Sequence, residues 1–149
     1  MLIRAFRESD FEAIKRIYAN SKLDELRLEL AQFELLPLIQ DTKRLSEFSE
    51  SQVIVYELDS RVVAYGAEFE AHIRAVFVDS SVRRLGIGRA LLEYFLDYIN
   101  GDISLNVAKS NAPAKALYRQ YGFDVVDEFT ANYNGVNAIV NTMLLSRNS

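Results

Sequence analysis

The sequence contains no cysteine among its 149 residues, and this absence excludes several kinds of chemistry. A chain without thiols has no disulfide scaffold, no thiolate zinc site, no iron–sulfur cluster and no covalent cysteine intermediate. Because it has a single histidine, His72, a transition-metal site would consist almost entirely of carboxylates, and we expect no metal. The two prolines and six glycines are also too few for a flexible linker or a repeat array.

Long apolar runs are also absent, since no stretch approaches the roughly 20 residues that span a bilayer. The first seven residues lack the apolar core and the cleavage site of a signal peptide. We therefore expect a cytoplasmic protein without a membrane partner. Its net charge of −4 argues against a nucleic-acid partner, because phosphate neutralisation supplies most of that affinity. With 50% hydrophobic and 26% charged residues, the chain is typical of a single globular domain over residues 1–149.

Hydrophobic periodicity and turn signals predict alternating strands and helices. Ser9 and Asp10 are expected to cap the first helix, and Pro37 interrupts one or two further helices over residues 22–49. Asn134 and Gly135 predict a two-residue hairpin turn. The expected strands cover residues 2–6, 53–58, 61–71, 72–78, 103–107, 123–133 and 136–145, and the other helices cover residues 10–20, 87–99 and 111–121. This order predicts an α/β domain on a mixed sheet.

Residues 76–92 carry the clearest chemical signal, because an apolar strand runs through a glycine-containing turn into a helix. Small residues allow a ligand to approach the backbone, and the first turn of a helix presents unpaired N–H groups. With the helix dipole and Arg83, Arg84 and Arg89, this is an anion site suited to a phosphate or pyrophosphate. The alternative is a helix start that uses glycine only for its turn. Neither the dinucleotide fingerprint nor the Walker motif is matched.

Residues 83–88, Arg-Arg-Leu-Gly-Ile-Gly, resemble the R/Q-x-x-G-x-G/A signature of the GNAT superfamily of N-acetyltransferases. Downstream, Asn106 and residues 111–123 resemble the second acetyl-CoA motif of that family. In that motif an asparagine opens a helix, a Leu-Tyr pair lies near its end, and Gly-Phe follows. Both motifs occur at the family's spacing, each on an expected strand–helix unit, and the order of elements extends the resemblance to most of the chain.

The resemblance implies a mixed sheet flanked by helices, with two splayed central strands that admit the pantetheine arm of acetyl-CoA. It implies that acetyl-CoA donates an acetyl group to an amine by direct attack in a ternary complex. The amides of residues 84–89 would hold the pyrophosphate, and the backbone of residues 76–78 would pair with the pantetheine arm. The cofactor-binding residues implied in this way are Val76, Phe77, Val78, Arg83, Arg84, Leu85, Gly86, Ile87, Gly88, Arg89, Asn106, Asn111 and Tyr118.

Three residues are the predicted catalytic groups. Tyr118 matches the family position that stabilises or protonates the departing thiolate, and its alternative is an aromatic side chain packed on a helix. His72 is predicted as the general base, directly or through a water, because its ordinary pKa suits proton uptake near neutral pH. The alternative is that His72 is a structural residue whose hydrogen bonds are made within the sheet. Glu70 is the competing base, and Glu68 and Glu70 would otherwise only alternate outward along the strand. A bulge in the strand over residues 72–78 would reset which side chains share a face.

The acceptor is not identified by the sequence. A small-molecule amine and the N-terminus of a peptide or protein both stay open, and many enzymes of this family form homodimers. Asp24, Glu25, Glu29 and Glu34 crowd the segment where such enzymes bind substrate, which either favours a cationic amine or forms a solvated face. The alternative functions are a non-catalytic acyl-CoA-binding or sensing module on the same fold and an unrelated phosphate-binding protein. The presence of Tyr118 and Asn111 counts against both.

Overall fold

A seven-stranded mixed sheet forms the centre of the computed structural model, which describes residues 2–147. The strands are β1 (Leu2–Ala5), β2 (Gln52–Leu58), β3 (Arg61–Phe69), β4 (His72–Val78), β5 (Ile103–Ala108), β6 (Asp124–Tyr133) and β7 (Val136–Leu145), in the order β1-β2-β3-β4-β5-β7-β6. All neighbours are antiparallel except β4 and β5, which run parallel. The predicted α/β class with a mixed sheet is confirmed.

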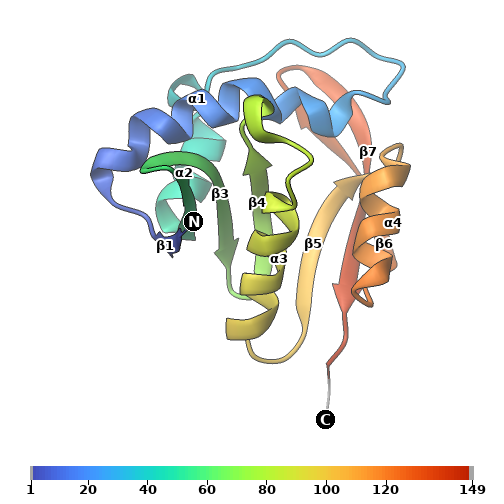
Figure 1. Cartoon of the computed structure of the whole chain (residues 1–149). Coiled ribbons are helices and arrows are strands. Elements are labelled where there is room, and N and C mark those ends of the chain that lie inside the picture. The colour runs from blue at the N-terminus through green and yellow to red at the C-terminus, as the bar shows by residue number, and fades with distance from the viewer. Residues whose placement is uncertain (1, 148–149) are drawn as a thin grey trace.

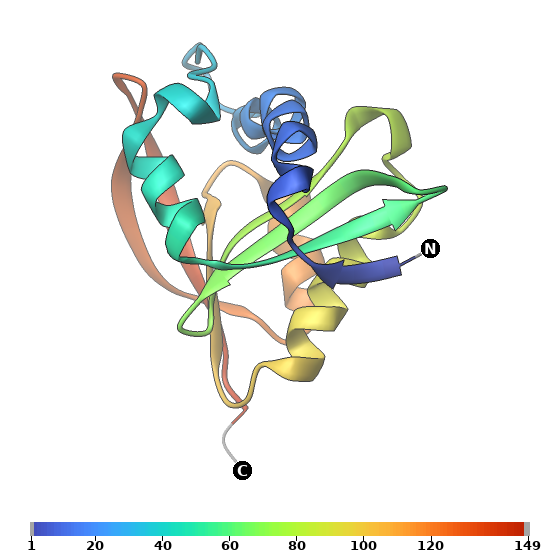
Figure 2. The same cartoon turned by 90° about the vertical axis from the view of Figure 1, so that its left-hand side faces the viewer.

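Four α-helices cover the two faces of this sheet: α1 (Phe11–Ser21), α2 (Thr42–Glu50), α3 (Ile87–Tyr98) and α4 (Ala112–Gln120). Helices α1 and α2 lie on one face, where apolar side chains of α1 pack against β2, β3 and β4. Helices α3 and α4 lie on the other face, where Leu91 and Phe95 of α3 are fully buried. Figures 1 and 2 show the two layers from perpendicular directions. None of the helices in residues 2–147 is long and apolar enough to cross a membrane.

The two central strands separate soon after they begin. Strands β4 and β5 pair only through His72 with Ser104 and Ile73 with Leu105, and beyond these pairs they diverge. Strand β4 also carries a bulge, because Ile73 and Ala75 pair with consecutive residues of β3 and leave Arg74 as the extra residue. The splayed strands and the bulge both agree with expectation.

Of the one or two further helices expected over residues 22–49, the structure has one α-helix, which follows Pro37. Only α2 is an α-helix there; residues 22–26 and 38–40 form 3-10 turns, and residues 27–37 are irregular. The loop takes its hydrogen bonds from the β6–β7 hairpin, since Leu36 N–H donates to the Tyr133 hydroxyl and the Asn134 side chain donates to the carbonyl of Glu34. These partners are about 100 positions away in the chain, so local periodicity does not reveal them.

Asp10 does not cap α1 as expected. Its carboxylate accepts the Arg7 N–H at 2.8 Å and forms an ion pair with Arg4 on β1. The competing charged partner therefore takes the side chain away from the helix. Two other local predictions are confirmed: Asn111 Oδ1 accepts the Ala114 N–H at the start of α4, and Asn134 and Gly135 both have positive φ in the hairpin turn.

Candidate active site

The turn before α3 has the backbone shape that an anion site requires. Gly86 has φ +80° and Arg84 has φ +68°, so two residues of the turn adopt the left-handed conformation before the helix begins at Ile87. A Cβ added at Gly86 would meet no atom within 4 Å. At Gly88 it would meet only the side chains of Val78 and Val76, at 3.6 and 3.9 Å. The backbone of the turn is therefore open to a ligand, and the first amides of α3 face outward from the helix end.

This turn borders a cavity of about 410 Å³, which we call the turn cavity. It joins residues from the end of β4, the turn and α4. Of the sequence-predicted residues it brings together Val76, Phe77, Val78, Arg83, Arg84, Gly86, Ile87, Gly88, Asn111 and Tyr118. Leu85 and Arg89 do not line it: both are exposed, and the Arg89 guanidinium bonds instead to Gln120 and Tyr121 of the α4 end.

A second cavity of about 80 Å³, the cleft cavity, lies where β4 and β5 diverge. Ile73 to Phe77 form one wall, Leu105 to Ala108 the other, and Asn106 contributes here rather than to the turn cavity. Six residues line both cavities: Glu25, Val76, Phe77, Asn111, Ala114 and Tyr118. The two spaces are therefore neighbours across the same side chains, as an extended ligand entering between the strands would require.

The backbone of β4 faces this cleft at alternate residues. The Asp79 N–H donates to the Val63 carbonyl on β3. Because the backbone groups of successive residues point to opposite edges of a strand, the N–H and C=O groups of the odd-numbered residues after the bulge point toward β3, and those of the even-numbered residues point away from it. The Val78 carbonyl accordingly accepts hydrogen bonds from the Ser21 hydroxyl and Arg83 Nε. By the same alternation the polar backbone groups of Val76 point into the cleft.

Arg83 fastens the turn to its surroundings. Its guanidinium forms an ion pair with Asp24 and donates to the Asn20 carbonyl at 2.9 Å and the Ser21 hydroxyl at 3.2 Å. These bonds, together with the one to Val78, leave little of the guanidinium for an anion. Arg84 is exposed and forms no recorded ion pair or side-chain hydrogen bond within residues 2–147. Arg84 is thus available to an anion, as is Arg27, which also lines the turn cavity and donates only to the Asp24 carbonyl.

Tyr118 lies on α4 with its ring packed edge-on against Phe123, at a centroid distance of 6.0 Å. Burial raises the pKa of Tyr118 to about 12, and the negative charge of Glu25 contributes in the same direction. The phenol therefore stays protonated at neutral pH. A protonated hydroxyl bordering both cavities can donate a hydrogen bond to an anion that develops there.

The predicted bases lie apart from these cavities. His72 stands at the closed end of the cleft, where its Nδ1 is 2.7 Å from the Ser104 hydroxyl, and it lines neither cavity. Burial, assisted by the charge of Arg74, lowers the pKa of His72. Glu70 is exposed in the β3–β4 turn with φ +50°. Glu68 is buried and accepts hydrogen bonds from the Tyr98 hydroxyl and the Ala71 N–H, so it does not face outward.

Sequence reasoning missed the position of Glu25. This residue, in the 3-10 turn after α1, is the one carboxylate of residues 2–147 that lines the cleft cavity. Its carboxylate accepts a hydrogen bond from Lys22 Nζ at 3.2 Å. The sequence shows that this segment is rich in acidic residues but does not show their partners. Asp24 forms an ion pair with Arg83, and Glu29 accepts a hydrogen bond from Ser110. Composition alone therefore does not show which of these three carboxylates borders the cleft cavity.

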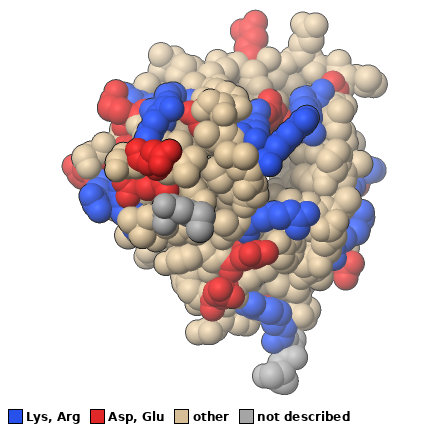
Figure 3. Space-filling model, viewed as in Figure 1, with Lys and Arg blue, Asp and Glu red and all other residues tan. Residues whose placement is uncertain are grey.

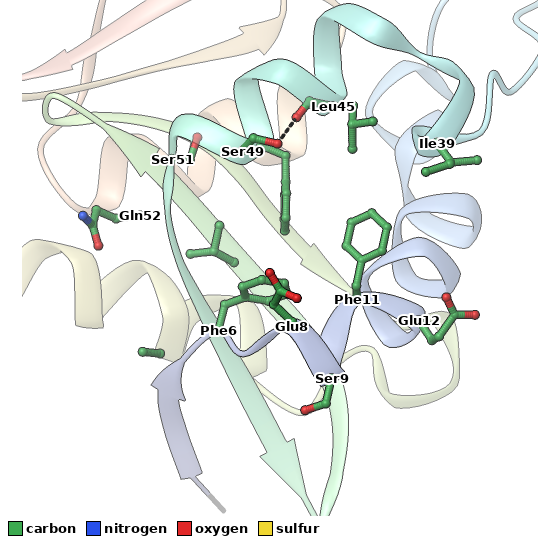
Figure 4. A pocket seen from close by; sticks show the side chains of 13 residues that line it. Phe6, Glu8, Ser9, Phe11, Glu12, Ile39, Leu45, Ser49, Ser51 and Gln52 are labelled. Atoms are coloured by element: carbon green, nitrogen blue, oxygen red, sulfur yellow. Dashed lines mark hydrogen bonds between the residues drawn. The ribbon is translucent and has the colours of Figure 1, made fainter.

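A third cavity of about 60 Å³, the inner cavity, lies on the α1–α2 side of β4 and shares Arg74 and Ala75 with the cleft cavity. A fourth cavity, larger than these three at about 940 Å³, opens elsewhere, between the end of β1, α1 and α2. Figure 4 shows its aromatic floor with Phe6 and Phe11, and Glu8 and Glu12 beside them. It contains none of the predicted site residues. Charged side chains of both signs are intermixed on the face in Figure 3, which shows no continuous basic surface.

Comparison with known proteins agrees with this geometry. Residues 11–123 match the model of the Acetyltransferase (GNAT) family. The chain is 27% identical over 129 residues to the peptidyl-lysine N-acetyltransferase YiaC of Escherichia coli K12, and the match covers 85% of each chain.

Two solved structures share the fold. The ribosomal-protein-alanine N-acetyltransferase of Brucella melitensis superposes with a TM-score of 0.72 and 24% identity, over 99% of this chain and 100% of that one. The yncA protein of Salmonella typhimurium, solved with its cofactor acetyl-CoA, gives a TM-score of 0.73 and 20% identity, over 100% and 95% of the two chains. These likenesses show that the chain shares the fold of these two proteins. The chain belongs to the GNAT acetyltransferase family.

Proposed function

We propose that this protein is an N-acetyltransferase that transfers the acetyl group of acetyl-CoA to an amine by direct attack within a ternary complex. The observation that carries the proposal is the adjacency of the turn cavity and the cleft cavity, which share Tyr118 and the exposed backbone of Val76. Acetyl-CoA supplies an activated thioester. The open glycine turn at Gly86 fits its pyrophosphate, and the cleft fits its narrow arm.

The residues of the site divide the work of the transfer. The α3 amides and Arg84 bind the pyrophosphate, and the backbone of Val76 orients the arm and polarises the thioester carbonyl. As the amine nitrogen forms its bond to the acetyl carbon, the carbon–sulfur bond breaks and sulfur departs with the electron pair. Tyr118 donates a hydrogen bond to that sulfur. A complete proton transfer from a phenol of pKa about 12 to a thiolate would be uphill. The thiol pKa is about 8.5, so the cost is roughly 5 kcal/mol, and hydrogen bonding is the better description.

The amine must lose a proton before or during attack, because an alkyl ammonium with a pKa of about 10.4 has no lone pair. His72 is the base proposed from the sequence, and from the closed end of the cleft it would act through water. Glu70 is its competitor by sequence. The position of Glu25 beside the cleft cavity favours a third assignment, in which that carboxylate receives the proton directly or through a water.

The pH dependence of kcat/KM separates these three bases. His72→Ala, Glu70→Ala and Glu25→Gln are compared with the unchanged chain, with Glu8→Gln as a control at a carboxylate in the remote cavity. The variant that removes the acidic limb of the profile identifies the base. An acidic limb that persists in all three would assign proton removal to bulk water.

The acceptor is either a small-molecule amine or the N-terminus of a peptide or protein. The name of YiaC specifies peptidyl lysine as its acceptor, which supports testing protein acceptors as well as small amines. The competing function is a non-catalytic acyl-CoA-binding module. A hydroxyl at position 118 has no purpose in such a module, which would need only the turn and the cleft.

The decisive experiment measures free thiol released from acetyl-CoA in the presence of a panel of amines and peptides. We expect amine-dependent thiol release, slowed about 10²- to 10³-fold in Tyr118→Phe, the usual cost of losing one hydrogen bond to a developing anion. Calorimetry should show that Tyr118→Phe still binds CoA. CoA binding without thiol release for any amine would favour the binding module. Wild-type kcat in Tyr118→Phe, with chemistry rate-limiting, would assign Tyr118 to packing.

A further inference from the structure

The inner cavity contains a buried hydroxyl that nothing satisfies. Tyr18, on α1, is 3% exposed, and within residues 2–147 its hydroxyl has no hydrogen-bond partner. Its ring packs against Phe77, which secures the position of the side chain. A phenylalanine would fill the same space without stranding a polar group, which ordinarily costs about 1–3 kcal/mol. A hydroxyl at this position in the lining of a cavity therefore indicates a ligand atom that completes its hydrogen bonding.

A second donor in the same lining is also available. The Arg44 guanidinium makes no hydrogen bond in the part of the chain that the structure describes, and its ion pair with Asp41 is long, at 3.8 Å from Arg44 Nε to an Asp41 Oδ2 that is buried and likewise without a hydrogen-bond partner. It is held in place from one side by the Tyr133 ring, at 5.2 Å from the ring centroid. The Tyr133 hydroxyl is itself fixed by the Leu36 backbone. Arg44 is thus positioned while its donors stay free.

Two of the three cations that line the inner cavity, Lys22 and Arg74, are paired with carboxylates. Arg74 forms an ion pair with Glu50 at 2.7 Å and also bonds to Ser51. Lys22 bonds to Glu25 at 3.2 Å. The acidic residue of this lining is Glu47: its backbone carbonyl accepts from Arg74, and its carboxylate forms no ion pair within residues 2–147. The Tyr18 hydroxyl, which has no partner, and Arg44, which is paired only with Asp41, are therefore the donors of the lining that a ligand can use.

We propose that the acetyl acceptor is a small amine that carries its own carboxylate, in the manner of an amino acid. The carboxylate would bind to the Tyr18 hydroxyl and the Arg44 guanidinium in the inner cavity. The amine would extend past Ala75 into the cleft cavity, beside Glu25. This inference rests on the proposed acetyltransferase activity and names the substrate class of the same site.

Charge and size support this class over the alternatives. A guanidinium with free donors matches a carboxylate in charge and in planar geometry. Glu25 lines the cleft cavity, and its carboxylate, which already accepts from Lys22, can also accept from an ammonium group, so each end of a zwitterion would meet an opposite charge. The inner cavity, at about 60 Å³, has room for a small polar group rather than for a folded peptide segment. It borders the cleft cavity at Arg74 and Ala75, so the acceptor would have to pass these two residues.

The test uses matched pairs of acceptors with the full-length protein. Amino acids, including an ω-amino series of increasing chain length, are compared with their own C-terminal amides and with peptides blocked at the C-terminus. We expect kcat/KM for the carboxylates to exceed that for the amides by about 10- to 100-fold, as for a hydrogen-bonded charge. Arg44→Gln should abolish this preference and leave the amides within about threefold. Lys43→Gln, an equal charge change at an exposed neighbour on α2, should preserve it.

Tyr18→Phe supplies a readout that a purely structural role would not give. We expect it to raise KM for the carboxylates while leaving the melting temperature of the free protein unchanged or higher, because an unsatisfied buried hydroxyl is removed. A loss of stability without a change in KM would overturn the assignment. So would a carboxylate preference that survives both Tyr18→Phe and Arg44→Gln, or faster acetylation of the blocked peptides.

A calorimetric arm separates this inference from the proposed function. The acceptors are titrated into protein saturated with CoA, where no transfer takes place. If no amine is acetylated in the activity assay, the proposed function fails. The carboxylate site still stands if the carboxylates bind and Arg44→Gln weakens that binding by at least tenfold, and it falls if they do not bind.

Discussion

Replacing Gly86 by alanine tests the geometry of the turn with the smallest available change. An alanine Cβ at this position would touch no atom within 4 Å, so the substitution introduces no clash. Its only cost is the left-handed backbone, because φ at Gly86 is +80° and an L-residue with a Cβ is penalised there by about 1–2 kcal/mol. The expected effect is therefore a conformational one, and its size is fixed before any ligand is considered.

That cost must appear in one of two places. If the turn keeps its shape in the free protein, the strain lowers the free energy of unfolding by about 1–2 kcal/mol, a decrease of roughly 2–8 °C in melting temperature for a chain of this size. If the turn relaxes instead, acetyl-CoA must restore the shape on binding, and Kd rises about 5- to 30-fold. We expect at least part of the cost in Kd, because an anion held by backbone amides depends on their alignment.

Gly101 provides the matched control. It has the same φ of +80°, its added Cβ would also meet nothing within 4 Å, and it lies beyond the other end of α3. Gly101→Ala should show the stability loss alone, with the Kd of acetyl-CoA unchanged by calorimetry. If Gly86→Ala leaves Kd as unchanged as Gly101→Ala does, and both lose similar stability, the turn does not hold the pyrophosphate.

Two further substitutions test packing and charge. A Cβ at Gly66 would lie 2.6 Å from Cε2 of the fully buried Phe95. Gly66→Ala should therefore lower the free energy of unfolding, measured with denaturant, by about 1–3 kcal/mol. Adding Phe95→Leu should restore most of that loss. Burial alone would raise the pKa of Asp79, but hydrogen bonds from Ser81 and Arg16 lower it to about 2. Its stabilising effect is therefore complete above about pH 4 and lost as the pH falls toward 2. Asp79→Asn should lower the melting temperature at pH 7 and flatten its decrease between pH 4 and pH 2, and an unchanged acid profile would contradict this reasoning.

The sequence predicts those parts of the molecule whose causes are local. The glycine turn, the Asn111 cap and the Asn134-Gly135 hairpin each follow from the conformational preferences of a few adjacent residues, and they are found where expected. The path of residues 27–37 depends on Tyr133, and the exposure of Glu70 depends on where the β3–β4 turn falls. Such contacts between distant segments leave no periodic signal.

The candidate site likewise combines a part that local sequence predicts with a part that depends on contacts between distant segments. The glycine-turn motif proposed to bind the cofactor is contiguous and can be recognised in the sequence, whereas the residues that border the cleft from outside it cannot. Tyr18, Glu25 and Arg44 come from α1, a 3-10 turn and α2, respectively, and in the sequence they are ordinary members of amphipathic or charged segments. Their chemistry emerges only from the hydrogen bonds that each one has or lacks.

The splayed centre of the sheet also bears on how the protein holds together. Between β4 and β5 the ladder consists of two residue pairs, whereas β3 with β4 and β5 with β7 are paired along most of their lengths. The backbone ladder thus divides the molecule into a four-stranded and a three-stranded subsheet joined by a short seam. A ligand arm lying between the open ends would bond to both edges and lengthen that seam. Ligand occupancy and the cooperativity of unfolding are therefore linked, since the two subsheets separate less readily when the gap between them is bridged.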